Sequence, residues 1–183
     1  MSLLKITDLT QRFGGLTAVS DLQVDLKEGG LYGLIGPNGA GKTTIFNMVS
    51  GFYDPTEGSI DFNGTVINGK KPHSVTALGI GRTFQNIKLW HDMTVLDNIR
   101  LSQHYYLGYS IGEIFLRTKN YFSNEKRITE KSMELLGVFG LTDIAEEYPK
   151  NLPYGIQRRV EIARALATEP KLLLLDEPAA GLN

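Results

Sequence analysis

The hydrophobic residues in the first 35 positions fall into short runs that turn residues separate, a pattern typical of short strands. The last of these runs, LYGLI at positions 31–35, stops at Gly36, where a glycine-rich stretch begins. A short apolar run that ends in glycines is typical of a strand buried in a parallel sheet. We therefore expect a buried strand at 31–35 that leads into a glycine loop.

The next part of the chain predicts one helix and one hairpin. Residues 42–50 favour a helix, and Gly51 is a typical stop signal. Residues 59–67 alternate apolar and polar side chains around the pair Asn63-Gly64. Because Asn-Gly is a strong signal for a tight turn between two strands, we expect a β-hairpin there.

Residues 86–150 differ in character, because they combine helix-like spacing with few strand signals. Their aromatic residues include Trp90, Tyr105, Tyr106, Tyr109, Phe115, Tyr121 and Phe122. We predict an α-helical subdomain in which most of these rings pack, with a minority free to line a groove for a partner helix. Within it, residues 125–139 favour a helix that Gly140 ends.

A further helix is predicted at 156–168, where apolar residues recur at helical spacing with charged residues on the other side. The apolar positions are Ile156, Val160, Ala163 and Ala167. The adjacent cations Arg158 and Arg159 are interpreted as part of a solvated face. The run KLLLLD at 171–176 predicts a second short buried strand, which ends in the carboxylate of Asp176.

Composition narrows the possible functions. The 183 residues suffice for one hydrophobic core and one inserted subdomain. With 19 basic and 20 acidic residues the net charge is −1, which disfavours nucleic-acid binding, and the lack of cysteine excludes disulfides and thiolate chemistry. No apolar run approaches the ~18 residues of a membrane span. The N-terminal MSLLKITDLT lacks the apolar core of a signal peptide, so the sequence favours a cytosolic protein.

The most specific motif is GPNGAGKT at positions 36–43, which fits the phosphate-binding pattern G-x-x-x-x-G-K-[ST]. Glycines let the backbone approach a phosphate, and the loop amides with the helix N-terminus attract an anion. Lys42 can reach the β- and γ-phosphates, and Thr43 offers Mg²⁺ a hard oxygen ligand. Thr44 can add a contact to the α-phosphate. The loop therefore predicts a nucleoside triphosphate site.

The second half of such a site is predicted where the leucine run ends. Asp176 is a carboxylate at the end of a buried strand, a position from which it can hold Mg²⁺, usually through water. The next residue, Glu177, is then placed to polarise an attacking water as a general base.

These motifs resemble, in the same order, those of the ATPase subunit of ABC (ATP-binding cassette) transporters. The matching segments are Phe13, the loop 36–44, Gln85 within RTFQN at 82–86, the signature segment LPYGIQRR at 152–159, Asp176-Glu177, and AGLN at 180–183. The strings at 12–16, 79–85 and 177–183 are more narrowly similar to importers of branched-chain amino acids. The resemblance covers essentially the full length.

This resemblance implies an α/β fold: a P-loop NTPase (ABC ATPase) core with an antiparallel β subdomain and an inserted α-helical subdomain. The expected divisions are an ATP-binding core with the β subdomain at 1–85, the helical subdomain with the signature segment at 86–154, and a return to the core at 155–183. In this family a histidine on the next strand, the switch histidine, senses the γ-phosphate. Its position would lie beyond Asn183, so the sequence is expected to be C-terminally incomplete.

The resemblance also implies a role for each matching residue. Phe13 stacks on adenine, and Glu177, Lys42 and Gln85 are catalytic. The implied Mg²⁺ ligands are Thr43, Gln85 and Asp176. The other implied contacts to ATP are Asn38, Gly39, Ala40, Gly41, Lys42, Thr43, Thr44, Gln85, Tyr154, Gly155 and Gln157.

The implied partners are a second ABC ATPase subunit, an integral membrane permease and, indirectly, a solute-binding protein, with no nucleic acid. Two cassettes, identical or paralogous, meet head to tail, so that each signature segment completes the other's ATP site. ATP binding closes this dimer and hydrolysis resets it. The implied location is the cytoplasmic face of the cell membrane.

One departure from the family pattern affects the signature segment. Pro153 stands where the family usually has a serine, and proline offers neither the hydroxyl nor the amide that contacts a γ-phosphate. Since a hydrogen bond to a charged group contributes about 1.5–3 kcal/mol, we expect ATP-driven closure to be weakened roughly ten- to a hundredfold.

The leading function is that of the ATP-binding and ATP-hydrolysing subunit of an importer for branched-chain amino acids. Three alternatives stay open on the sequence. One is the ATPase subunit of another ABC transporter, such as an exporter of lipids or lipopolysaccharide. Another is a catalytically weak regulatory module that binds nucleotide. The last is a DNA-repair or translation cassette, which the near-neutral charge and the single phosphate loop disfavour.

Overall fold

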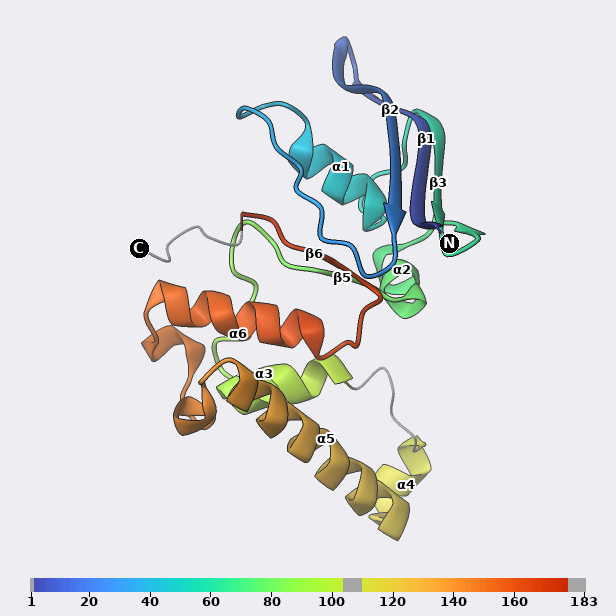
Figure 1. Ribbon diagram of the computed structural model, residues 1–183. Coiled ribbons are helices and arrows are strands. Elements are labelled where there is room, and N and C mark those ends of the chain that lie inside the picture. Colours follow the sequence, from blue (N-terminus) through green and yellow to red (C-terminus); the bar gives the residue numbers. More distant parts are fainter. Residues whose placement is uncertain (1, 104–109, 178–183) are drawn as a thin grey trace. The chain divides into compact units, whose positions relative to one another are not determined.

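The computed structural model describes residues 2–103 and 110–177, which belong to two compact units that divide after Ile80 (Figure 1). The first unit is built on a four-stranded antiparallel sheet with the order β2-β1-β3-β4. Its strands are β1 (Ser2–Phe13), β2 (Leu16–Lys27), β3 (Glu57–Phe62) and β4 (Thr65–Val66). The first 27 residues therefore form two long strands, where the sequence predicted shorter ones.

The hairpin predicted at 59–67 is confirmed. Phe62 pairs with Thr65, and the two residues between them both adopt the left-handed conformation, with φ of 50° at Asn63 and 79° at Gly64. Two such residues are what a tight hairpin turn between twisted strands requires.

Two helices complete the first unit. Helix α1 (Lys42–Val49) confirms the helix predicted at 42–50 and packs against β2, and α2 (Pro72–Leu78) was not predicted. The core of this unit is formed by Ile6, Leu9, Met48, Val49, Ile60, Phe62 and Val75.

The buried strand predicted at 31–35 is wrong. Residues 30–37 have no regular structure, and the side chains of Leu31 and Ile35 are almost fully exposed. A strand needs a neighbour that pairs with its N–H and C=O groups. The four-stranded sheet of this unit does not include the run, so within residues 2–80 it has no strand to pair with.

The second unit combines a two-stranded sheet with a group of helices. The sheet pairs β5 (Ile80–Arg82) with β6 (Leu172–Leu174), so the strand predicted at 171–176 exists but is shorter and only partly buried. The helices are α3 (Val95–Ser102), α4 (Ile111–Leu116), α5 (Lys119–Val138) and α6 (Tyr154–Leu166), with 3₁₀ turns at Thr142–Ile144 and Pro149–Asn151.

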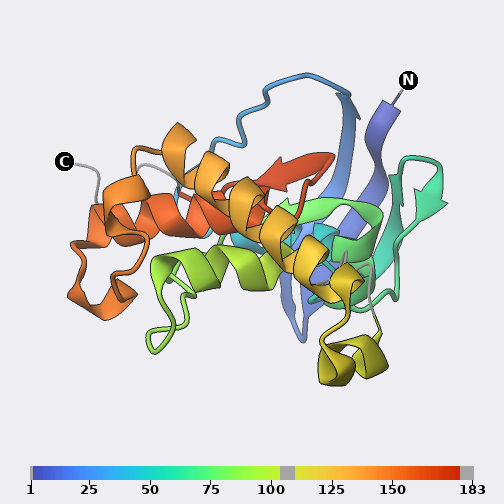
Figure 2. The ribbon, with the colours of Figure 1, turned by 90° about the horizontal axis from the view of Figure 1, so that it is seen from below.

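Helices form in the region predicted to be helical, and its helices α3 and α5 lie against one another and against α6, which follows them (Figure 2). Their shared core contains Val95, Ile99, Leu136, Leu141, Val160 and Ala163. Helix α5 ends before Gly140, as predicted, but it begins six residues before position 125 because the hydroxyl of Thr118 caps it by accepting from the amide of Tyr121.

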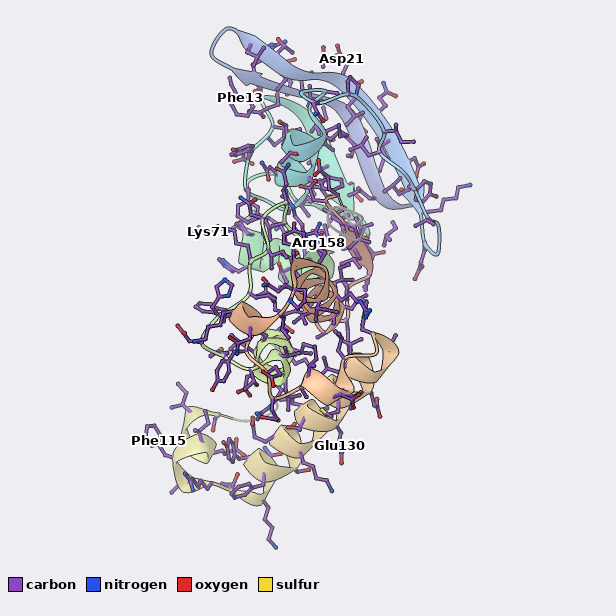
Figure 3. All side chains as sticks on the ribbon, turned by 90° about the vertical axis from the view of Figure 1, so that its left-hand side faces the viewer. Phe13, Asp21, Lys71, Phe115, Glu130 and Arg158 are labelled. Atoms are coloured by element: carbon purple, nitrogen blue, oxygen red, sulfur yellow. The ribbon has the colours of Figure 1, made fainter. Side chains whose placement is uncertain are left out.

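The aromatic residues of this subdomain are less buried than expected. Trp90, Phe115 and Phe122 are largely exposed (Figure 3 labels Phe115). Tyr105, Tyr106 and Tyr109 lie outside the described residues. Helix α4, which carries Phe115, is six residues long and packs against α5. Such a short element buries one side at most, which leaves its remaining apolar side chains in contact with water.

Candidate functional site

The phosphate loop joins the irregular segment 30–37 to α1. Lys42 is the first residue of the helix, and Gly41 precedes it with φ of 79°. No side chain caps this helix end. The first amides of a helix have no carbonyl one turn back, so those of Lys42, Thr43 and Thr44 remain available to an anion.

The conformation of Gly41 ties the loop to the sheet. A Cβ atom at this position would lie 2.5 Å from the carbonyl oxygen of Ala18 and 3.0 Å from Cγ2 of Val19. Both contacts come from β2. Only glycine fits here, because both its positive φ and this close approach exclude a side chain.

The ammonium group of Lys42 holds the loop in shape. Its Nζ donates to the carbonyl oxygens of Gly36, at 2.7 Å, and Pro37, at 2.8 Å. An ammonium has three N–H donors, so one remains for an oxygen outside the chain. The loop residues 37–40 are exposed, which leaves this side of Lys42 open to a ligand.

Phe13 lies at the same end of β2 as the phosphate loop. It pairs with Leu16, two residues before Ala18, whose carbonyl touches Gly41. At about 3.3 Å per residue, this spacing separates the two contacts along β2 by roughly 7 Å. Phe13 is 43% exposed, so part of its side chain is open to a ligand.

The ring of Tyr53 packs edge-on against Phe13, with centroids 5.5 Å apart, and is itself 44% exposed. Sequence reasoning missed Tyr53, because no motif marks a residue that follows α1 and meets Phe13 only through the fold.

Asp176 comes two residues after β6 and is only 7% exposed. Its amide donates to the hydroxyl of Thr83 at 3.2 Å, and its carboxylate pairs with the guanidinium of Arg82 at 3.4 Å. Burial lowers the pKa of Arg82, and the charge of Asp176 opposes that shift.

Glu177 differs from its neighbour in exposure. Its side chain is exposed, and its backbone adopts φ of 48°, a conformation uncommon for residues other than glycine. The chain therefore turns sharply after Asp176, which leaves one carboxylate buried and the next open to water.

The loop that carries Gln85 leaves β5 beside the end of β6. The amide of Thr83 donates to the carbonyl oxygen of Leu174 at 3.0 Å, and Thr83 also bonds Asp176. The second unit thus brings Gln85, which is exposed, and Asp176 to the same edge of the sheet.

The signature segment begins α6. Pro153 precedes the helix without a side-chain cap, and its carbonyl accepts from the amides of Ile156 and Gln157, both at 3.0 Å. The side chain of Gln157 donates back to the carbonyl of Leu152 at 2.8 Å, so it stabilises its own turn. Tyr154 is 45% exposed.

The solvated face predicted for Arg158 is wrong. This residue is 1% exposed and forms an ion pair with Glu161 at 2.6 Å. The missed signal was the spacing: opposite charges three residues apart on a helix lie close enough to pair, so both can be buried together.

The donors available to Mg²⁺ are few but of the right kind. Thr43 supplies a hydroxyl and Asp176 a carboxylate, both hard oxygen ligands. In residues 2–103 and 110–177 no three His, Cys, Asp or Glu side chains gather to hold an ion. Each of Thr43 and Asp176 is, in its own unit, a donor of the kind that fits a magnesium ion, which keeps several waters and is held by one or two side chains together with phosphates.

Two further observations concern the C-terminal segment and the membrane. The segment 180–183, one of those that match the family, lies outside the described residues. Within the described part of the chain, every helix is too short or too polar to pass through a lipid bilayer.

The loop at 36–43, with a lysine that begins a helix, defines the class of phosphate-loop nucleotide-binding proteins. Residues 19–180 match the family model described as ABC transporter. The chain belongs to the ABC transporter family, and it is a transport ATPase subunit that binds and hydrolyses ATP.

Relatives and solved structures agree with this assignment. The high-affinity branched-chain amino acid transport ATP-binding protein BraF of Pseudomonas aeruginosa is 42% identical over 181 residues, which cover 99% of this chain and 71% of BraF. A structure of the ADP conformation of an ATP-binding cassette of an ABC transporter matches with a TM-score of 0.82 and 32% identity, covering 100% of this chain and 71% of that one.

A second solved structure is a dimeric, post-hydrolysis state of an ATP-binding cassette with ADP and Pi. It matches with a TM-score of 0.81 and 26% identity, covering 98% of this chain and 76% of that one. These matches confirm the ABC ATPase fold that the sequence implied, and they support nucleotide binding.

Proposed function

We propose that this chain is the ATP-binding and ATP-hydrolysing subunit of an importer for branched-chain amino acids. The assignment of the substrate rests on the 42% identity, along almost the whole chain, to a protein named for high-affinity transport of these amino acids. The assignment of ATP binding rests on the phosphate loop and its lysine.

In the first unit, the residues bind and orient the nucleotide. The amides that begin α1 and the third donor of Lys42 bind the phosphates, while Gly39 and Gly41, both with positive φ, keep the loop backbone open to them. Asn38, Ala40 and Thr44 complete the cradle. The exposed part of the Phe13 side chain stacks on adenine, with Tyr53 fixing its tilt.

In the second unit, the residues act on the γ-phosphate and the attacking water. Mg²⁺, when bound, neutralises negative charge on the phosphate oxygens. The residues that would hold it are Gln85 and Asp176 of this unit and Thr43 of the first. Glu177 is exposed beside the buried Asp176, and it accepts a proton from the water that attacks.

We further propose the partners that an importer needs. A second cassette, identical or paralogous, meets this one head to tail, so that Tyr154, Gly155 and Gln157 at the start of α6 reach its ATP. A membrane-spanning permease contacts the helical subdomain and the loop of Gln85, which places the chain at the cytoplasmic face of the membrane. A solute-binding protein delivers the amino acid to the permease.

The test is Glu177→Gln in the protein assembled with its membrane partner. We expect ATP turnover and uptake of labelled leucine to fall together by about 100-fold, the contribution of a general base, while ATP still binds. Glu130→Gln is the matched control, because Glu130 is an exposed carboxylate on α5 that pairs only weakly with Lys126, at 3.7 Å.

The outcomes separate the alternatives. Loss of turnover with unchanged leucine uptake would exclude an importer of this substrate and favour another transporter, such as an exporter of lipids. The unaltered protein must also be measured. If it binds ATP tightly but the membrane partner does not stimulate its ATP turnover, the result would favour a regulatory module.

A further inference from the structure

We propose that Arg158 and Glu161 are a positioning pair, which fixes the loop of Gln85 and the backbone of Asp176 and Glu177 against α6. This inference rests on the proposed function, because it assigns the pair to the hydrolysis of ATP. It concerns two residues that touch neither the phosphates nor the attacking water.

The pair is sealed inside the second unit. Both side chains are 1% exposed, and Nη1 of Arg158 lies 2.6 Å from Oε2 of Glu161, one turn further along α6 (Figure 3 labels Arg158). Taking two charges out of water is costly, and an apolar pair of similar size often stabilises a fold as well or better. The pair therefore calls for an explanation beyond stability.

The guanidinium of Arg158 connects α6 to two functional segments. Nη1 donates to the carbonyl oxygen of Phe84, the residue before Gln85. Nη2 donates to the carbonyl oxygens of Asp176 and, at 3.2 Å, of Glu177. One planar group thus bonds the backbone just before Gln85 and the backbone of both site carboxylates.

The carboxylate of Glu161 completes the hold on the loop. Its Oε1 accepts from the amides of Phe84, at 3.4 Å, and Lys88, at 3.3 Å. Gln85 lies between these two residues, so the loop is attached to α6 on both sides of it. The Phe84 residue is held by its amide through Glu161 and by its carbonyl through Arg158.

This arrangement joins the three parts of the second unit that the proposed reaction uses: the helix of the signature segment, the Gln85 loop and the two carboxylates. A displacement of about 1 Å in a reacting group can cost up to 10²-fold in rate. We call the hydrogen bonds from Arg158 and Glu161 to these backbone segments the clamp. Such a clamp is sufficient to control turnover without contacting the substrate.

The decisive variant is the double change Arg158→Met with Glu161→Leu, measured in the protein assembled with its membrane partner. It replaces the ion pair with apolar side chains, so the helix can stay packed while the clamp is lost. We expect kcat for ATP to fall at least about tenfold, by misplacement of the carboxylates, and the Kd for ATP to stay within about threefold.

Arg158→Lys tests the geometry rather than the charge. A lysine keeps the cation, but its single nitrogen cannot span the four oxygens that the two guanidinium nitrogens reach. We expect an intermediate loss of kcat. The matched control is Arg100→Gln, which removes an arginine that bridges Asp97 and Glu125 in the same unit, at 2.9 and 2.8 Å, away from the site.

The outcomes distinguish this inference from the proposed function. A folded double variant with unchanged kcat would overturn the positioning role, and so would a loss equal to that of Arg100→Gln. Absence of turnover in the unaltered protein would instead contradict the proposed function.

Amide hydrogen exchange of the unaltered protein tests the clamp without any substitution. We expect the amides of Phe84 and Lys88 to be protected relative to those of Gln85 and Asn86. Equal exchange at the four positions would contradict the clamp, whether or not the variants fold.

Discussion

At the scale of single residues, Lys42 does two things at once. Two of its N–H donors hold the carbonyls of Gly36 and Pro37, and the third points to no carbonyl of the loop. Its replacement therefore removes both a support of the loop and a contact to phosphate.

We expect Lys42→Met to weaken ATP binding roughly ten- to a hundredfold, because a hydrogen bond to a charged group contributes about 1.5–3 kcal/mol. Calorimetric titration with ATP measures the change. The control is Lys5→Met, which removes an exposed cation from β1 in the same unit. An affinity for Lys42→Met equal to that of the control would contradict the assigned role.

At the scale of secondary-structure elements, the start of α6 lacks the side-chain cap that the other helices of the second unit have. Thr94 and Thr118 cap α3 and α5 with their side chains, and Ser110 forms a capping box with Glu113 at α4. At α6 this place belongs to Pro153, which has no side-chain acceptor. The helix end proposed to meet a γ-phosphate therefore has no side chain that accepts from its first amides, as is also the case at the start of α1.

We expect Pro153→Ser to add a cap that stabilises the protein by about 0.5–2 kcal/mol, since serine accepts from an amide of the first turn. The restored hydroxyl and amide should also raise ATP turnover in the assembled transporter. Thermal unfolding and steady-state ATPase assays measure the two effects. Pro153→Ala is the control, because alanine restores the amide without a cap, and no change or a fall in turnover for Pro153→Ser would count against this account.

Local signals were sufficient for some elements. Gly51 and Asn63-Gly64 end or turn the chain by their own backbone preferences, so the helix at α1 and the hairpin of β3 and β4 could be predicted. The segment 31–35 could not, because an apolar run becomes a strand only where another strand pairs with it.

The same limit applies to the site. The phosphate loop, Gln85 and Asp176-Glu177 carry recognisable motifs, and the structure places the last two at one edge of a sheet. Tyr53 and Arg158 carry none. Their roles depend on contacts between segments far apart in the sequence, such as the bond from Arg158 to the carbonyl of Phe84.

At the scale of the whole molecule, the two units divide the proposed work. Residues 2–80 hold the phosphate loop and the aromatic pair of Phe13 and Tyr53. The second unit holds the two carboxylates, Gln85 and the helix of the signature segment. In the proposed dimer, each ATP is shared by the loop of one subunit and the start of α6 of the other.

We expect the transporter extracted from membranes to contain two ATP-binding subunits and a membrane-spanning partner. Native mass spectrometry of the complex in detergent counts them, and the two masses decide between identical and paralogous cassettes. A complex with a single cassette, or a cassette that never copurifies with a membrane protein, would contradict the proposed assembly.

The phosphate loop is preorganised by the chain itself. The amide of Ala40 bonds Pro37 at 3.2 Å, Gly41 rests against β2, and the ammonium of Lys42 closes the ring. A receptor that is already shaped gives up little conformational entropy when its ligand arrives. Most of the free energy of binding between this loop and a polyphosphate is then available to drive conformational change elsewhere in the protein, as a transport motor requires of its nucleotide.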